Sequence, residues 1–228
     1  MNTQEKKTLN AGLLLLAAFV LWTVLIQCVD VRPLGQNGTN IGFAALNCWF
    51  HRLCGIHMAI YTVTDWLGLV PIAVCLCFAG LGLSQLLKRR SLFQVDLDII
   101  LLGVYYVLVI SGYVVFESIP INYRPIPING VMEASYPSST TLLVLSVMPT
   151  LNFQAERRIR NRTLKRAICA ASSVFMLLMV VGRTVAGVHW LTDILGAVLL
   201  SAGLFLLYKA SVMMIDRRRT GTEGADWN

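Results

Sequence analysis

Three charged or titratable side chains lie close together between two apolar segments of the chain. They are Arg183, His189 and Asp193, spaced by six and four positions. Charge in an apolar environment is costly, so residues of this kind mark functional sites by default. Residues i and i+4 share one face of a helix, so the carboxylate of Asp193 can orient the imidazole of His189. An oriented imidazole can act as a nucleophile or as a base.

Two further segments carry side chains that suit an anionic ligand. Arg124 lies in an Asn-Tyr-Arg-Pro segment, and Ser138, Ser139 and Thr140 open an apolar run. Guanidinium groups bind phosphate through two hydrogen bonds at once, so Arg124 and Arg183 are candidate phosphate-binding residues. The hydroxyl groups and the N–H groups at the start of a helix add donors for the same anion. Together these residues predict a phosphoryl-transfer site that uses neither a metal ion nor another cofactor.

The composition is that of a membrane protein. Hydrophobic residues make up 56% of the chain, charged residues make up 14%, and the mean hydropathy is +0.67. Soluble domains carry about 25% charged residues. The net charge of +7 does not predict a nucleic-acid partner, because the basic residues form short clusters between apolar runs rather than one basic face. We therefore expect a single integral membrane domain over residues 1–228, surrounded by membrane lipids.

Six apolar segments are candidates for membrane-spanning helices. A helix needs about 20 predominantly apolar residues to cross a bilayer. The fourth candidate is short and contains Pro149. The sequence predicts an all-α bundle of six transmembrane helices at residues 11–29, 66–87, 97–116, 138–153, 167–185 and 191–208.

The distribution of positive charge predicts the orientation of this bundle. All but four of the 19 Lys and Arg residues fall in segments on one side of the predicted spans. Cytoplasmic segments carry the excess of Lys and Arg, so we expect both termini to be cytosolic. Residues 30–65, 117–137 and 186–190 then lie outside, which places the candidate site on the outer face of the cell membrane. The four exceptions are Arg32, Arg52, Arg124 and Arg183.

The first outer connection, residues 30–65, is long and partly apolar. Its segment Phe43–Ile60 suits either an interfacial helix in the headgroup layer or an ordered loop packed over the bundle. Cys48 and Cys54 lie in the same segment, where a disulfide and two free thiols are both open possibilities.

At the site residues the sequence resembles the type 2 phosphatidic acid phosphatase (PAP2) superfamily of membrane lipid phosphatases. The third signature of that family, Ser-Arg-x5-His-x3-Asp, is matched by Gly182-Arg183-x5-His189-x3-Asp193. The resemblance implies a six-helix bundle of PAP2 type, a lipid phosphate substrate and a bacterial cytoplasmic membrane. It also implies that His189 is the nucleophile, which forms a phosphohistidine, and that Asp193 orients it. Arg183 and Arg124 are then phosphate clamps, and Ser138 contacts the phosphate.

The other two signatures of the family, Lys-x6-Arg-Pro and Pro-Ser-Gly-His, are altered. The Lys of the first falls on Glu117, the His of the second falls on Thr140, and the Ser before Arg183 is Gly182. In the family this His protonates the leaving alkoxide. Threonine cannot do so near neutral pH, and general acid catalysis contributes about 100- to 10,000-fold to a rate.

Two hypotheses follow from these departures. The first is a phosphatase that favours a lipid diphosphate, such as a polyprenyl diphosphate, or that uses another proton donor. The second is a catalytically impaired PAP2-like protein that binds or transports a lipid phosphate. The retained His–Asp pair favours the enzyme, because binding alone does not require it. The sequence leaves the existence of a homo-oligomer open.

The first hypothesis requires candidates for the other proton donor. On the outer side these are Glu117, Glu133, His51 and His57.

Overall fold

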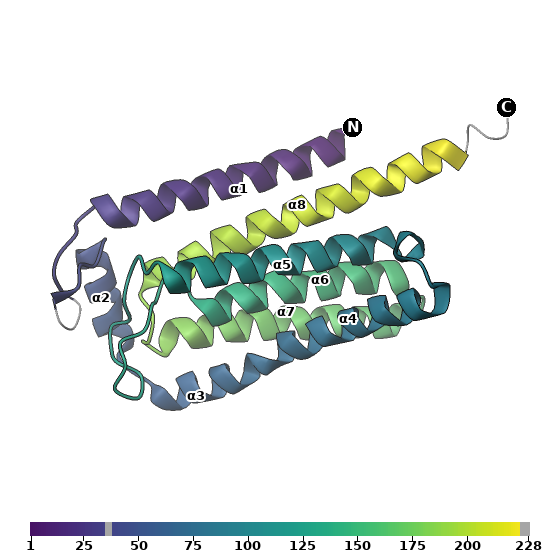
Figure 1. Ribbon diagram of the computed structural model, residues 1–228. Coiled ribbons are helices and arrows are strands. Elements are labelled where there is room, and N and C mark those ends of the chain that lie inside the picture. The colour runs from purple at the N-terminus through teal and green to yellow at the C-terminus, as the bar shows by residue number, and fades with distance from the viewer. Residues whose placement is uncertain (35–37, 224–228) are drawn as a thin grey trace.

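The computed structural model describes residues 1–34 and 38–223, and the chain forms a bundle of long helices (Figure 1). The N-terminus and the C-terminal end of α8 lie at the same end of this bundle, and α2 lies at the opposite end. The elements, in order, are α1 (Thr3–Cys28), α2 (Ala44–Cys54), α3 (Met58–Leu67), α4 (Leu69–Arg89), the 3-10 helix η2 (Leu92–Gln94), α5 (Leu97–Ser118), α6 (Ser139–Arg158), α7 (Arg162–Val185) and α8 (Leu191–Glu223).

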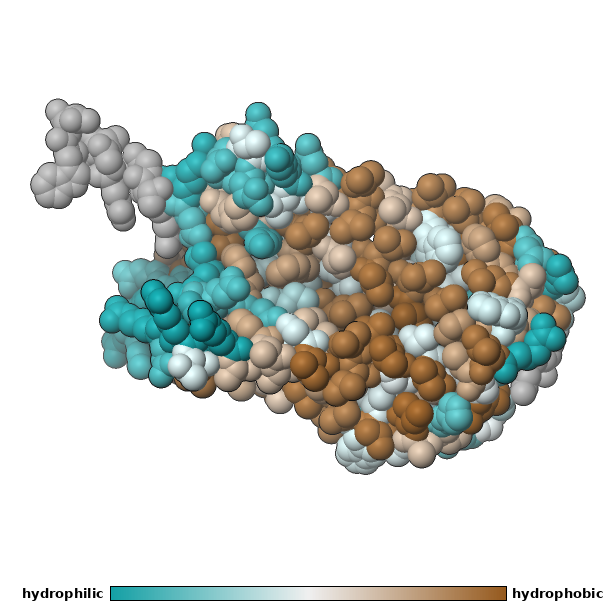
Figure 2. Space-filling model, turned by 180° about the vertical axis from the view of Figure 1, so that it is seen from behind, coloured by the Kyte–Doolittle hydropathy of each residue, from teal (hydrophilic) through white to brown (hydrophobic). Residues whose placement is uncertain are grey.

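The surface of the bundle has an apolar middle and polar ends, as expected for a membrane protein. Figure 2 shows hydrophobic side chains over the central part of one face and hydrophilic side chains toward both ends. Leu14, Leu76, Val107 and Leu177, from four different helices, each expose more than half of their surface. Exposed apolar patches of this extent are unfavourable in water and mark a membrane-facing surface.

Five helical segments are long and apolar enough to cross a membrane. They are α1, the continuous pair α3–α4, α5, α7 and residues 191–218 of α8. The remaining predicted span corresponds to α6, which has 20 residues but is more polar. This helix packs against α4, α5, α7 and α8, so much of its surface faces protein. A helix in that position can hold polar residues that a lipid-facing helix cannot. Six membrane crossings therefore remain a prediction.

Several helices begin before the apolar runs that predicted them. Helix α1 starts at Thr3 rather than near residue 11, because Asn2 and Glu5 form a capping box. Helix α7 starts at Arg162 rather than at residue 167, because the side chain of Asn161 accepts hydrogen bonds from the first free N–H groups. Polar caps thus extend these helices beyond their apolar segments.

The segment Phe43–Ile60, for which the sequence left an interfacial helix and an ordered loop open, contains α2 and the start of α3. Helix α2 ends at Cys54, and α3 begins at Met58 and continues into α4. Cys48 and Cys54 both lie in α2 as free thiols. Six residues of helix rise about 9 Å, which exceeds the Cα separation of about 7 Å that a disulfide can bridge. The two cysteines are therefore not disulfide partners.

The connection from α5 to α6 folds as a short hairpin over one end of the bundle. Ile128 and Val131 exchange backbone hydrogen bonds of 2.9 Å across the turn Asn129-Gly130. Both turn residues have positive φ, at 50° and 79°, as a two-residue hairpin turn with Asn-Gly requires. Further back, the N–H of Ser135 donates to the carbonyl of Asn122 at 2.9 Å. The hairpin therefore places Asn122 directly beside Ser135.

The start of α8 is fixed by contacts with α1 and α2. The indole N–H of Trp22 donates to the carbonyl of Thr192 at 3.1 Å, and the side-chain amide of Asn47 donates to the Thr192 hydroxyl at 3.0 Å. The hydroxyls of Thr23 and Tyr136 lie 2.7 Å apart. These bonds hold the first turn of α8 and the segment before α6 at one end of the bundle.

Candidate active site

The imidazole of His189 lies in the turn between α7 and α8 and is buried. Its Nε2 atom is 3.2 Å from Nη2 of Arg183, and a guanidinium group can only donate. Nε2 therefore accepts this hydrogen bond, and the proton resides on Nδ1, which lies 3.1 Å from the carbonyl oxygen of Ser135. The lone pair that a nucleophile needs is on the atom that faces the arginine.

The surroundings of His189 keep its ring neutral. Burial lowers the pKa of His189 well below its usual value, and the positive charges of Arg183 and Arg124 lower it further. A neutral imidazole is the nucleophilic form. The physical setting thus favours the state that an attack on phosphorus requires.

The carboxylate of Asp193 reaches the imidazole through Ser135. Nδ1 of His189 and Oδ2 of Asp193 are 4.0 Å apart, which is too far for a direct hydrogen bond. The Ser135 hydroxyl lies 3.1 Å from Nδ1 and donates to Oδ2. Asn122 and the N–H of Trp190 also donate to this carboxylate, at 3.2 and 2.9 Å. Ser135 and Asn122 therefore belong to the candidate site, although the sequence alone did not single them out.

Two buried arginines lie on one aromatic ring next to the histidine. The guanidinium carbons of Arg183 and Arg124 are 4.9 and 5.9 Å from the centroid of the Tyr61 ring. Arg183 is 1% exposed and Arg124 is 7% exposed. Within the described part of the chain, no hydrogen-bond partner is found for Nε of Arg183 or for Nε and Nη1 of Arg124. Buried donors of this kind are costly, and a bound anion would satisfy them.

Each arginine also faces a carboxylate that is open to solvent. Asp65 Oδ1 lies 3.7 Å from Nη1 of Arg183, and Glu133 Oε2 lies 2.9 Å from Nη2 of Arg124. The two carboxylate side chains are 57% and 38% exposed. They hold the arginines in place from the solvent side, and exposed pairs of this kind contribute little free energy. An incoming phosphate can therefore compete with them.

Gly182, which replaces the family's serine, leaves space for a residue of α3. A Cβ atom at Gly182 would lie 2.8 Å from the methyl carbon of Thr64. The hydroxyl of Thr64 lies 3.5 Å from Nη1 of Arg183. The close approach of α3 and α7 thus brings the hydroxyl group of Thr64 near Arg183.

The serines and the threonine at the start of α6 lie in different surroundings. Ser138 is fully buried; its hydroxyl donates to Thr141, and its N–H donates to the carbonyl of Asp193 at 3.2 Å. Ser139 and Thr140 line a groove beside the site. Ser138 therefore stabilises the start of α8, whereas Thr140 forms part of the wall of the groove.

The four candidate proton donors lie in different places. Glu117 is exposed and lines a small hollow with Tyr113. His51 and His57 lie within hydrogen-bonding distance of the carbonyls of Gly187 and Cys54, at 3.1 and 2.9 Å. Glu133 pairs with Arg124, as described above.

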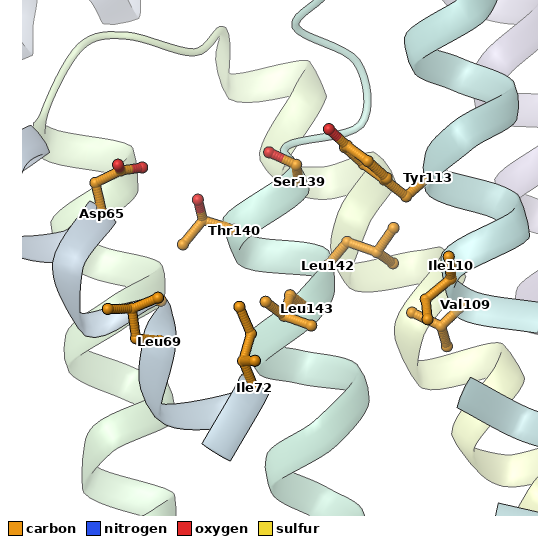
Figure 3. Close-up of a pocket in the computed structure, with 11 residues that line it drawn as sticks. Asp65, Leu69, Ile72, Val109, Ile110, Tyr113, Ser139, Thr140, Leu142 and Leu143 are labelled. Carbon is orange, nitrogen blue, oxygen red and sulfur yellow. The ribbon is translucent and has the colours of Figure 1, made fainter. Parts of the chain in front are cut away.

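A largely apolar groove of about 260 Å³ opens beside the arginines (Figure 3). Its apolar walls come from α4, α5 and α6 and include Leu69, Ile110 and Leu143. The oxygen atoms of Asp65 and Thr140 point toward the same space from facing walls. Such a groove can hold a hydrocarbon chain while its polar rim stays near the phosphate site.

The same residues offer little to a metal ion. No cluster of three His, Cys, Asp or Glu side chains with the spacing of metal ligands occurs in residues 1–34 and 38–223. The group next to Nε2 of His189 is instead the guanidinium of Arg183, a hydrogen-bond donor that suits an anion.

Comparison with known proteins identifies the fold and the family of this chain. A crystal structure from Bacillus subtilis, described as the first transmembrane PAP2 type phosphatidylglycerolphosphate phosphatase, has a similar fold with a TM-score of 0.54 and 18% sequence identity. The match covers 90% of this chain and 96% of that chain. No curated protein matches the sequence. The family model of the PAP2 superfamily matches residues 39–217, which include every site residue described above, so the chain belongs to the PAP2 superfamily.

Proposed function

We propose that the protein is a membrane phosphatase that hydrolyses a lipid phosphate or diphosphate through a phosphohistidine at His189. The observation that carries this proposal is the contact of 3.2 Å between the unprotonated Nε2 and the guanidinium group of Arg183. A phosphate held by this arginine and by Arg124 would meet the lone pair of a neutral imidazole. Membership of the PAP2 superfamily supports phosphatase activity in the broad sense.

The first step would transfer the phosphoryl group to the histidine. Nε2 attacks phosphorus as the bond to the leaving oxygen breaks, and the ring becomes a phosphorylated imidazolium. Arg183 and Arg124 stabilise the charge on the equatorial oxygens of the transition state. Ser135 and Asp193 stabilise the positive charge of the ring, because the Nδ1 proton points to a hydroxyl that is bonded to the carboxylate. Water then attacks phosphorus, the P–N bond breaks, and inorganic phosphate leaves.

The substrate would lie with its hydrocarbon chain in the groove of Figure 3. This groove opens to the side of the bundle between α3–α4 and α5, where apolar side chains line it. A lipid diphosphate suits the site in particular, because its leaving group is a phosphate and needs little protonation. We further propose that the site faces the outside of a bacterial cytoplasmic membrane, which follows from the excess of basic residues at the opposite end.

Phosphate release by the purified protein tests this function. We expect release from farnesyl phosphate, farnesyl diphosphate or a diacylglycerol phosphate in the presence of a metal chelator. Substrate labelled at the transferred phosphate should leave an acid-labile label on the wild type and none on His189→Ala. Loss of the nucleophile should lower kcat by at least about 10,000-fold. Tight binding of these lipids without release or labelling would instead show a lipid-phosphate binding or transport protein.

A further inference from the structure

The groove beside the phosphate site carries one carboxylate on its wall. Among the side chains that line it, Asp65 is the only Asp or Glu. It comes from the last turn of α3, and its side chain is 57% exposed. In the family the second signature supplies a histidine as proton donor, and this chain has Thr140 there. Thr140 lines the same groove as Asp65, so both residues border the space next to the departing group.

The two ends of one guanidinium group connect Asp65 to the nucleophile. Nη2 of Arg183 is 3.2 Å from Nε2 of His189, and Nη1 is 3.7 Å from Oδ1 of Asp65. In phosphoryl transfer the attacking and leaving atoms lie roughly in line on opposite sides of phosphorus. With reacting atoms about 3 Å apart and a hydrogen bond of about 3 Å, a donor to the leaving oxygen lies on the order of 7 Å from Nε2. His189 and Asp65 contact different nitrogen atoms of one guanidinium group, so a phosphate bound to Arg183 can lie between the two side chains.

The junction of α3 and α4, which carries Asp65, packs against Thr140, the residue in the place of the family's histidine. The N–H of Gly68 donates to the carbonyl of Asp65 at 3.0 Å, which forms the tight junction of α3 and α4. A Cβ atom at Gly68 would lie 3.5 Å from the methyl carbon of Thr140. The α3–α4 junction thus occupies the space in front of Thr140, and it carries a side chain that can donate a proton.

The other acidic and basic groups near the site are placed less well. Glu133 pairs with Arg124 at 2.9 Å and does not line the groove. Glu117 lines a small hollow that adjoins the groove at Tyr113 and Ser139, but it does not line the groove itself and no contact joins it to Arg183 or Arg124 within the described residues. His51 and His57 face backbone carbonyls.

We propose that Asp65 is a catalytic residue that protonates the leaving oxygen, an inference that rests on the proposed phosphatase function. In the substrate complex the phosphate and the Asp65 side chain would both lie at the guanidinium group of Arg183, and the proton for the leaving oxygen would be carried by the Asp65 carboxyl group. As the P–O bond breaks, the carboxylic acid gives this proton to the leaving oxygen, and the lipid alcohol departs. In the second step the Asp65 carboxylate takes a proton from the attacking water as the P–N bond breaks. Inorganic phosphate then leaves, and the acid is restored.

Two substrates with the same hydrocarbon chain test this role. Farnesyl phosphate expels an alkoxide, which needs a proton, whereas farnesyl diphosphate expels a phosphate, which needs little help. We expect Asp65→Asn to lower kcat on the monophosphate by at least about 100-fold and on the diphosphate by less than tenfold. KM should fall for both substrates, because the variant lacks the carboxylate that competes with the substrate phosphate for Arg183. Asp65→Glu should keep more of the monophosphate activity than Asp65→Asn.

Glu133→Gln is the matched control, because it removes the carboxylate that pairs with the second arginine. Its effect on kcat should be equal for the two substrates. An Asp65→Asn loss that is also equal for both substrates, or no loss at all, would overturn this role while the proposed function stands. Absence of release and labelling in the wild type would overturn the proposed function and this inference with it.

Discussion

Among the single residues of the site, Ser135 links the imidazole of His189 to the carboxylate of Asp193. Its hydroxyl can accept from Nδ1 of His189 while it donates to Asp193, so it favours the tautomer in which Nε2 carries no proton. We expect Ser135→Ala to lower the rate of phosphohistidine formation by roughly 10- to 100-fold, as loss of an orienting partner does elsewhere. Rapid-quench labelling measures this rate. Ser172→Ala removes another buried hydroxyl, on α7, and should leave the rate unchanged.

The charge state of His189 gives a second prediction. Its pKa lies well below the usual value because of burial and the positive charges of Arg183 and Arg124. The ring should therefore stay neutral as the pH falls through 6.5, and protonate only in more acidic solution. Inorganic phosphate would offset the arginine charges, so its binding should raise this pKa. NMR titration of labelled histidine, assigned with His189→Ala, measures both effects. A free-enzyme midpoint at or above 6.5 would contradict the first.

The sequence predicted part of this site and missed the rest for a clear reason. The spacing of Arg183, His189 and Asp193 signals their proximity, because all three lie near one turn. Ser135 and Asn122 act only because the hairpin pairs their backbones. The one signal for that pairing is the Asn129-Gly130 dipeptide between apolar residues, which is typical of a two-residue hairpin turn. Asp65 and Tyr61 come from α3, and no spacing relates that helix to the other segments.

At the scale of helices, the close contact of α3 and α7 is set by a residue without a side chain. A Cβ atom at Gly182 would lie 2.8 Å from the Thr64 methyl carbon, so Gly182→Ala should destabilise the protein by about 1–3 kcal/mol. Thr64→Ser removes this methyl group and keeps the hydroxyl near Arg183. We expect the double variant to recover most of the loss, and unfolding in detergent measures each stability. Additive effects of the two changes would contradict a direct contact.

The helices themselves were largely predictable from apolar segments, but their limits were not. Apolar length identifies α1, α4, α5, α7 and α8. The predicted span at residues 138–153 corresponds to α6, although this helix packs against four others and is more polar. Apolar length fails at the ends of α1 and α7, where polar caps extend the helix beyond its apolar run.

At the scale of the whole molecule, most of the basic residues lie at the end of the bundle opposite the site. The end opposite the site carries ion pairs between α5, α6 and α8, including Arg158 with Asp98 at 2.8 Å and Arg157 with Asp216 at 2.6 Å. The positive-inside rule assigns this end to the cytosol.

Reporter insertions test this orientation. A fluorescent protein fused after residue 223 should fluoresce in cells, because it stays in the cytosol. A peptide tag inserted between Asn129 and Gly130 should react with an impermeant antibody on intact spheroplasts. A tag in the η2 turn, near Phe93, is the matched control and should react only after permeabilisation. The reverse pattern would place the active site inside the cell.

Helices α1 and α8 run side by side, although they come from opposite ends of the described chain (Figure 1). Trp22 and Thr23 of α1 contact the two segments that carry Asp193 and Ser135, through Thr192 and Tyr136. During synthesis α1 enters the bilayer long before α8 leaves the ribosome. The contacts that join Ser135, His189 and Asp193 can therefore form only after α8 has been made and packs against α1.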